Sequence, residues 1–302
     1  MLQVFYADHF VLPLPPGHRF PMKKYQMLRD EVSTYLDLAL NEAPLASVED
    51  LLLAHDVSYI ERVLQGQLTE AEQREIGFPW SEQMVIRSRR SAGATIAACG
   101  AAWENGVGVN LAGGTHHAYA DKGSGFCVFN DAAIAAKKIQ LKLYDHLKNH
   151  LRVAIIDLDV HQGNGTASIL KDDSSVFTFS MHGEKNFPFR KESSDLDIGL
   201  PDGCADEEYL NALQDGLDQI HMHFHPEFVI YLAGADPYQG DRLGRLHLSI
   251  AGLGKRDEKV LQWCFEREVP VAIAMAGGYG NSIEETVAIH AQTIRKAIAF
   301  QW

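Results

Sequence analysis

The sequence predicts an α/β protein with a single domain, built on a parallel β-sheet with helices on both faces. Apolar strand-like runs alternate with helix-like segments over most of the length, and no Pro/Ser/Gly-rich linker interrupts them. This alternation is typical of parallel sheets. Polar residues of catalytic type also follow several of the runs directly, and open α/β sheets bind ligands at the carboxyl ends of their strands. We therefore expect one domain over residues 1–302.

The first half of the chain opens with a short strand-like run and is otherwise mostly helical in pattern. Ser47 and Asp50 have the spacing of a capping box, which marks the start of a short helix. The long helix-like segment at 81–103 becomes small and apolar at 92–102, so we expect it to be buried. The expected strands are 3–6 and 107–112, and the expected helices are 22–40, 58–64, 81–103 and 130–147.

The second half repeats the same rhythm and ends in a helix that Ser282 and Glu285 would open as a capping box. Residues 183–204 have no clear periodicity, and long loops in compact domains are often functional, so we expect an active-site wall there. The expected strands are 152–158, 176–180, 228–234 and 269–276, and the expected helices are 165–170, 206–224, 255–268 and 282–300.

Composition restricts the class of protein. The chain is 46% hydrophobic and 22% charged, as in ordinary globular proteins. Its net charge of -13 argues against direct binding to nucleic acid and is compatible with a cationic substrate. No apolar run is long enough to span a membrane. Four cysteines without a C-x-x-C pair, and an N-terminus unlike a signal peptide, predict free thiols and a cytoplasmic location.

Two expected strand ends carry residues that could bind a metal. The pentapeptide DLDVH follows one apolar run at 157–161, and Asp236 follows another. Because side chains alternate along a strand, Asp157, Asp159 and His161 would point the same way. We expect Asp159, His161 and Asp236 to be the ligands. Two oxygens and one nitrogen leave an open position, as in catalytic zinc sites, and iron(II) would accept the same donors.

Two further strand ends carry residues suited to proton transfer. His116 and His117 follow the run at 107–112, and Tyr279 lies in a glycine-rich turn after 269–276. We expect the tandem histidines to act in general acid/base catalysis, with Asp157 orienting one imidazole. The Tyr279 hydroxyl could donate to an oxyanion opposite the metal.

At these motifs the sequence resembles the zinc-dependent histone deacetylase superfamily. The matching segments are GGTHHA at 113–118, GFCVFND at 125–131, DLDVHQGNG at 157–165, GADP at 234–237 and GGYG at 277–280. They occur in the order and spacing of that family, and HQGNG at 161–165 and GDRLG at 240–244 look most like class IV enzymes and their bacterial relatives. The resemblance covers almost the whole chain and implies an arginase/deacetylase-like fold.

The resemblance also implies roles for the tandem histidines. His116 would pair with Asp157, and His117 would face Asn164, where class I enzymes typically carry an aspartate. A neutral partner stabilises an imidazolium less than a carboxylate does, so His117 would stay neutral and act as the base. His116 would hold a proton more easily.

A structural monovalent cation, usually potassium, is a second implication of the resemblance. It would bind the Asp157 side chain and the backbone carbonyls of Asp157, Asp159 and His161. Residues near Ser180 and Met181 would complete the site.

A substrate tunnel is the third implication. Phe126 and Phe187 would form its walls, and Gly114 and Gly278 its floor. Leu243 would lie close to the metal. The positions near the metal, Gly114, Gly278 and Leu243, include no large aromatic group, which would leave room beyond the metal.

The activity implied is zinc-dependent hydrolysis of an N-acyl amide, most simply of acyl-lysine in a protein or peptide. One alternative is a deacetylase of small acetylated amines such as acetylpolyamines, which an activity panel would distinguish. The other is a catalytically silent acyl-lysine binding module. The presence of Asp159, His161, Asp236 and Tyr279 disfavours the silent module.

Overall fold

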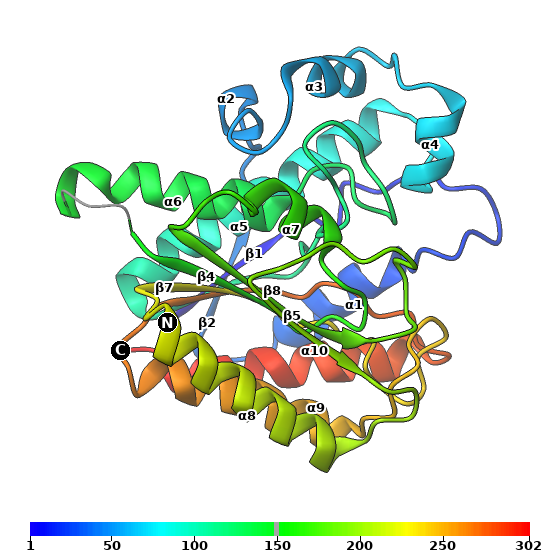
Figure 1. Ribbon diagram of the computed structural model, residues 1–302. Coiled ribbons are helices and arrows are strands. Elements are labelled where there is room, and N and C mark those ends of the chain that lie inside the picture. Colours follow the sequence, from blue (N-terminus) through cyan, green and yellow to red (C-terminus); the bar gives the residue numbers. More distant parts are fainter. Residues whose placement is uncertain (148–150) are drawn as a thin grey trace.

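The computed structural model describes residues 1–147 and 151–302 and contains an 8-stranded sheet, in which every strand pair is parallel. Figure 1 shows the sheet crossing the middle of the molecule. The predicted fold class is thus confirmed. The strand order is β2-β1-β3-β8-β7-β4-β5-β6. The strands are β1 (Leu2–Tyr6), β2 (Leu38–Glu42), β3 (Val107–Asn110), β4 (Val153–Asp157), β5 (Val176–Gly183), β6 (Leu196–Leu200), β7 (Phe228–Leu232) and β8 (Val271–Ala274).

Helices cover both faces of the sheet (Figure 1). On one face lie α1 (Lys23–Val32), α8 (Asp206–His223), α9 (Ile250–Phe265) and α10 (Ile283–Ala297), followed by the short 3₁₀ helix Ile298–Phe300. On the other face lie α5 (Glu82–Asn105), α6 (Asp131–Leu147) and α7 (Asn164–Leu170). The short helices α2 (Val48–Leu51), α3 (Val57–Leu64) and α4 (Glu70–Ile76) lie beyond α5.

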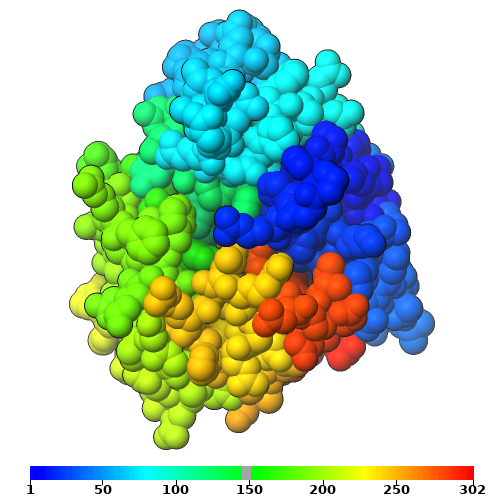
Figure 2. All heavy atoms as spheres, turned by 90° about the vertical axis from the view of Figure 1, so that its right-hand side faces the viewer, coloured from blue at the N-terminus to red at the C-terminus, as the bar shows by residue number. Residues whose placement is uncertain are grey.

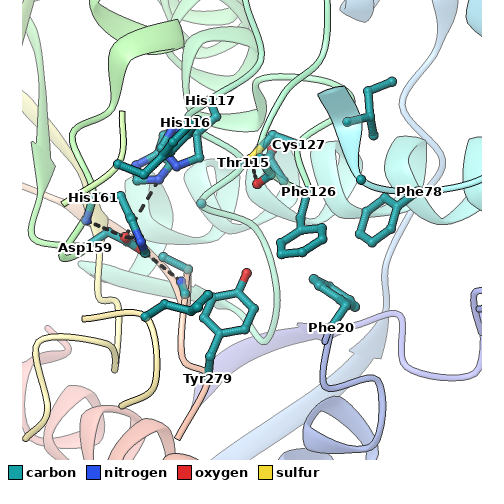
Figure 3. A pocket seen from close by; sticks show the side chains of 18 of the residues that line it. Phe20, Phe78, Thr115, His116, His117, Phe126, Cys127, Asp159, His161 and Tyr279 are labelled. Atoms are coloured by element: carbon teal, nitrogen blue, oxygen red, sulfur yellow. Dashed lines mark hydrogen bonds and ion pairs between the residues drawn. The ribbon is translucent and has the colours of Figure 1, made fainter. Parts of the chain in front are cut away.

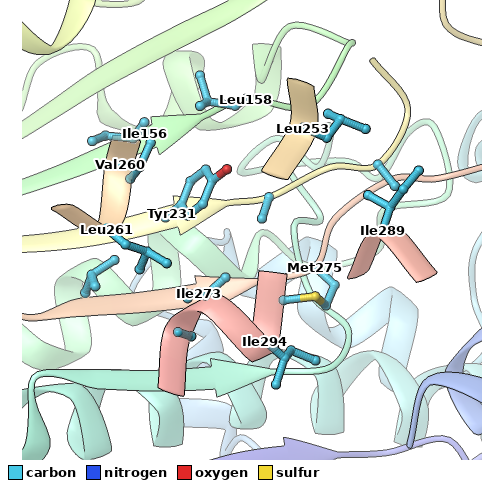
Figure 4. Close-up of a cluster of buried hydrophobic side chains, with 14 of the residues drawn as sticks. Ile156, Leu158, Tyr231, Leu253, Val260, Leu261, Ile273, Met275, Ile289 and Ile294 are labelled. Carbon is cyan, nitrogen blue, oxygen red and sulfur yellow. The ribbon is translucent and has the colours of Figure 1, made fainter. Parts of the chain in front are cut away.

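Alternate residues of the central strands pack into two separate cores. In β4, Ile156 belongs to one core and Ile155 to the other, and Tyr231 and Ile230 divide in the same way in β7. Figure 4 shows the first core, where the sheet meets α9 and α10. Because both faces are covered, these strands are continuous apolar runs in the sequence rather than alternating ones.

Three elements differ from the sequence-based expectation. The helix expected at 22–40 ends at Val32, and Leu38–Glu42 forms strand β2 instead. Strand β6 lies inside the segment expected to be a loop, and α4 was not expected at all. β2 and β6 are edge strands. Their side chains are less completely buried than those of the central strands, so their apolar signal is weak.

Two helix starts also bear on the predicted capping boxes. Ser47 and Asp50 form the reciprocal box at α2, as predicted. At α10 only half of the predicted box forms: the Ser282 hydroxyl oxygen accepts from the Glu285 amide, while the hydroxyl itself donates to the Glu284 side chain. Helix α9 begins earlier than expected, with Ser249 as its N-cap.

Two structural findings bear on the expectations drawn from composition, one on the cysteines and one on membrane-spanning helices. All four cysteines are buried free thiols. Among the described residues, no helix has both the length and the apolar character needed to cross a bilayer.

The contact between β3 and α5 gives a test of the packing. A methyl group on Gly108 of β3 would lie 2.2 Å from the Ala98 carbonyl oxygen of α5. Gly108→Ala should therefore lower the free energy of unfolding by about 1–3 kcal/mol, because the backbones would have to separate. Urea denaturation would measure the difference.

Gly100→Ala, within α5, is the matched control. The nearest atom to a methyl group there is the Lys142 Nζ, at 3.5 Å, which is ordinary contact. Because alanine favours helix over glycine, this change should stabilise the protein by up to about 1 kcal/mol. Equal effects of the two substitutions would contradict the packing described.

Candidate active site

Asp159, His161 and Asp236 lie together beyond the ends of the adjacent strands β4 and β7. One ligand-type atom from each lies within 4.8 Å of the others. The His161 Nδ1 is 2.9 Å from Asp159 Oδ1 and 3.4 Å from Asp236 Oδ2. All three side chains are buried. The structure thus brings the three residues expected to be ligands into one group. Figure 3 shows two of them, Asp159 and His161, beside each other.

The surroundings of this group fit a divalent cation. The buried Asp236 Oδ2 has no hydrogen-bond partner among the described residues. A methyl group on Gly277 would lie 2.0 Å from this oxygen, so only glycine leaves the space beside it open. Burial and the charge of Asp159 raise the pKa of Asp236 to about 7. A cation between the two carboxylates would offset that repulsion.

A buried arginine binds the backbone just before Asp159 and Asp236. Arg256, in α9, donates from Nη1 to the carbonyl oxygens of Gly234 at 2.6 Å and Leu158 at 3.3 Å. Its charge is balanced by Asp257, 2.8 Å from Nη2, and Asp257 also accepts from the Tyr231 hydroxyl. The two carbonyls precede Asp236 and Asp159 by one or two positions, so Arg256 locks both strand ends together. Sequence reasoning missed this residue, because a helical arginine normally lies at the surface.

The tandem histidines have unlike partners. His116 Nδ1 is 2.6 Å from Asp157 Oδ2, and His117 Nδ1 is 2.6 Å from Asn164 Oδ1. Burial opposes a charge on His116, but the nearby carboxylates outweigh it and raise its pKa to about 9. Burial and the neighbouring histidines lower the pKa of His117 well below its ordinary value. At neutral pH the pair therefore offers one proton donor and one proton acceptor.

Asp131, at the start of α6, fixes the loop that carries these histidines. Its carboxylate accepts from the amides of Gly114 at 3.1 Å and Thr115 at 2.7 Å, and from the Thr115 hydroxyl at 2.6 Å. The loop passes so close that a methyl group on Gly113 would lie 2.5 Å from Asp131 Oδ2. Gly113 also has a positive φ of 80°, which glycine adopts most readily. In the sequence, Asp131 stands out only as the last residue of the motif at 125–131.

Tyr279 is held through its backbone from two sides. Its amide donates to Asp241 Oδ2 at 2.6 Å. The buried Lys24 donates to the carbonyl oxygens of Ala276 and Gly278, each at 3.3 Å, and its Nζ lies 5.7 Å from the centre of the Tyr279 ring. Burial raises the pKa of Tyr279 well above its ordinary value, so the hydroxyl remains a donor. No pattern in the sequence pointed to Lys24.

The group lies at the bottom of a cavity of about 800 Å³. Figure 3 shows Phe20, Phe78 and Phe126 gathered on one side of the cavity, with the histidines across from them. The ring centres of these phenylalanines are 4.9 to 5.5 Å apart. Phe187 packs edge-on against His117 on the other side, at 4.9 Å. No motif in the sequence indicates a function for Phe20 or Phe78.

Most of the residues expected to form the tunnel do line this cavity: Gly114, Phe126, Phe187 and Leu243. Gly278 does not. A side chain at that position would face Thr286, Ala235 and His290, away from the cavity. Its neighbour Gly277 lines the cavity instead, because the turn before Tyr279 brings that glycine next to the Asp159 and Asp236 carboxylates.

Residues expected to bind a monovalent cation lie on adjacent strands. Asp157 of β4 is paired with Ser180 of β5, and Met181 follows within the same strand. The Ser180 hydroxyl is 3.0 Å from His182 Nδ1. The structure therefore brings Ser180 next to Asp157, which already contacts His116.

His55 connects two loops of the site and can do so only as a neutral ring. Its Nδ1 lies 2.9 Å from the Tyr119 carbonyl oxygen, to which only a protonated nitrogen can donate. Its Nε2 accepts from the Asn130 amide at 2.9 Å, which needs a free lone pair. Burial lowers its pKa to about 4.

Comparisons of the sequence with known proteins point to one family. The family model of the histone deacetylase domain matches residues 18–294. An uncharacterized protein of Picosynechococcus sp. is 42% identical over 297 residues, 97% of each chain. Histone deacetylase 2 of Arabidopsis thaliana is 35% identical over 260 residues, covering 83% of this chain and 66% of that protein. Histone deacetylase 8 of Xenopus tropicalis is 31% identical over 257 residues, covering 78% and 67%.

Solved structures agree on the fold. An HDAC homolog from Aquifex aeolicus has a TM-score of 0.81 and 24% identity, covering 98% of this chain and 84% of that chain. An HDAC homolog complexed with SAHA has a TM-score of 0.82 and 24% identity, covering 98% and 83%.

Because His55 is neutral in the folded protein, we expect the free energy of unfolding to decrease in acid. Its pKa of about 4 when folded is below the ordinary value of 6.5. The unfolded chain therefore takes up the proton first, and the stability contributed by His55 is lost as the pH falls from about 6.5 to about 4. The loss should reach about 3 kcal/mol. Denaturation with urea from pH 7 to pH 4, with a chelator present, would measure it.

His55→Gln should make this dependence shallower by the same amount, because glutamine does not titrate. His223→Gln changes an exposed histidine at the end of α8 and should leave the curve as it is. If the His55 variant keeps the full dependence on pH, the neutral-ring assignment is wrong.

Proposed function

The chain belongs to the histone deacetylase family, and from that premise we propose that it is a metal-dependent amidohydrolase that removes acyl groups from lysine side chains in proteins or peptides. The observation that carries the proposal is the buried group Asp159, His161 and Asp236 at the bottom of a cavity. Two histidines of opposite protonation preference and a tyrosine surround it.

Asp159, His161 and Asp236 would hold the metal. Zinc suits one nitrogen and two oxygen donors, and iron(II) is the alternative. When bound, the metal would lower the pKa of water and polarise the substrate carbonyl. Two observations support this assignment: Asp236 Oδ2 has no hydrogen bond among the described residues, and Gly277 leaves space beside it.

The remaining groups would move protons and stabilise charge. His117 is neutral and would take the proton from the attacking water, because its Nδ1 is already engaged with Asn164 and its other nitrogen is free to accept. The protonated His116, or His117 after it has gained the proton, would give a proton to the leaving amine. The Tyr279 hydroxyl would donate to the oxyanion that forms from the amide carbonyl.

Two further roles belong to the same proposal. The aromatic walls formed by Phe126 and Phe187 suit a thin aliphatic chain such as the stem of lysine. A potassium ion near Asp157 and Ser180, coordinated also by backbone carbonyls, would support the geometry of the His116–Asp157 pair.

Asp236→Ala should remove bound metal and deacylase activity while the protein remains folded, because one of three ligands is lost. Elemental analysis would measure the metal, and circular dichroism would check the fold. Asp172→Ala changes an exposed carboxylate and should keep both metal and activity. A full metal content in the Asp236 variant would overturn the ligand assignment.

Tyr279→Phe should keep metal and substrate binding but lose turnover by on the order of a hundredfold or more, because one oxyanion donor is removed. Steady-state kinetics on an acetyl-lysine peptide would separate kcat from KM. Tyr35→Phe removes a hydroxyl that bonds to Arg295, outside the cavity, and serves as the control. A near-normal kcat would mean that Tyr279 only packs.

A further inference from the structure

The mouth of the cavity carries a charge opposite in sign to that of the whole chain. The protein has 40 acidic and 27 basic side chains other than histidine. Yet the exposed charged residues that line the cavity are mostly cationic: Arg19, Arg74, Lys185 and Arg245, against the single acid Glu75. These residues come from separate parts of the chain. In Figure 2 the dark blue, cyan, green and yellow segments that carry them meet around a hollow.

The local acids neutralise only part of this positive charge. Glu75 forms an exposed ion pair with Lys122 at 2.6 Å, which balances part of its charge. Asp202, outside the cavity lining, is shared by Arg245 at 3.2 Å and Lys185 at 3.9 Å. Two cations therefore share one carboxylate.

The other two cations are still less constrained. Arg74 faces Glu70 at 3.4 Å, but both side chains are highly exposed, and water and salt weaken such pairs. Within the described part of the chain, Arg19 makes no ion pair. The mouth thus retains positive charge that a ligand could meet.

From this arrangement we infer that the cavity mouth selects acyl-lysines flanked by acidic residues and disfavours polycationic acylated amines. The inference rests on the proposed deacylase function and names its substrate class. Acylation removes the charge of the lysine itself, so the acyl-lysine stem enters without repulsion from the four cations. Carboxylates on the neighbouring residues would then lie near the mouth, where opposite charges increase the rate of encounter.

The same charge would act on the product. Hydrolysis frees a lysine amine, which takes up a proton and becomes a cation. The positive mouth would therefore disfavour re-entry of that cation from solution. An acetylpolyamine carries further ammonium groups and would meet this repulsion on entry as well.

The test compares three peptides with one central acetyl-lysine and flanking residues that are aspartate, alanine or arginine. With the zinc-loaded full chain, kcat/KM should fall from the acidic to the neutral to the basic peptide, by about tenfold in total. The difference should lie in KM rather than kcat. It should shrink at 0.5 M salt, where charges are screened within a few ångströms. Fluorescence anisotropy of labelled peptides would give the same order of affinity independently of turnover.

Two double variants assign the effect to the mouth. Lys185→Glu with Arg245→Glu should reverse the preference, because both residues are exposed and line the cavity. Lys171→Glu with Lys255→Glu makes the same change of charge at exposed positions outside the lining and should leave the preference unchanged.

The outcomes separate the two claims. Equal kcat/KM and equal affinity for the three peptides, or a preference that the first double variant leaves intact, would overturn the inference while the deacylase function stands. Failure to hydrolyse any of the peptides would overturn the proposed function and the inference together.

Discussion

The repulsion between two buried carboxylates, Asp159 and Asp236, is the constraint on which much of the structure depends. The adjacent parallel strands β4 and β7 place both acids at the same carboxyl end of the sheet, where the two side chains are at most 2% exposed. Such a pair is costly unless a cation or hydrogen bonds compensate for it. His161 lies between them, the Gly277 amide donates to Asp159, and the Val160 amide donates to Asp236. Behind them, Arg256 ties the two strand ends together.

A second consequence of burial is that small chemical differences between partners become large differences in protonation. His116 and His117 are neighbours in sequence, and their ring centres are 4.1 Å apart. The first bonds to a carboxylate and the second to an amide, at the same distance of 2.6 Å. In a medium with little water, that difference raises one pKa and leaves the other depressed. One loop therefore supplies both an acid and a base.

Residues far away in the sequence hold the backbone segments of the site in place through hydrogen bonds. Lys24 precedes Tyr279 by more than 250 residues, yet it holds the turn of that tyrosine through two carbonyls. Asp131 holds the histidine loop, and His55 connects Tyr119 in that loop to Asn130, just before α6. These contacts are buried and local in space, so they position the side chains without reaching the cavity mouth. The charge of the residues at the cavity mouth can therefore differ from the charge of the catalytic groups below them.

The sequence by itself predicted the fold class and the group of Asp159, His161 and Asp236. Its resemblance to a family implied the pairing of Asp157 with His116 and of Asn164 with His117. Strand periodicity and the polar residues after buried runs are local signals, and the family motifs preserve their order. Only the tertiary structure decided that Gly277 rather than Gly278 lines the cavity. It also revealed the support from Lys24 and Arg256, the edge strands β2 and β6, and the positive mouth of an acidic protein. These features depend on which remote segments meet, and the distance between two side chains in space leaves no trace in local periodicity.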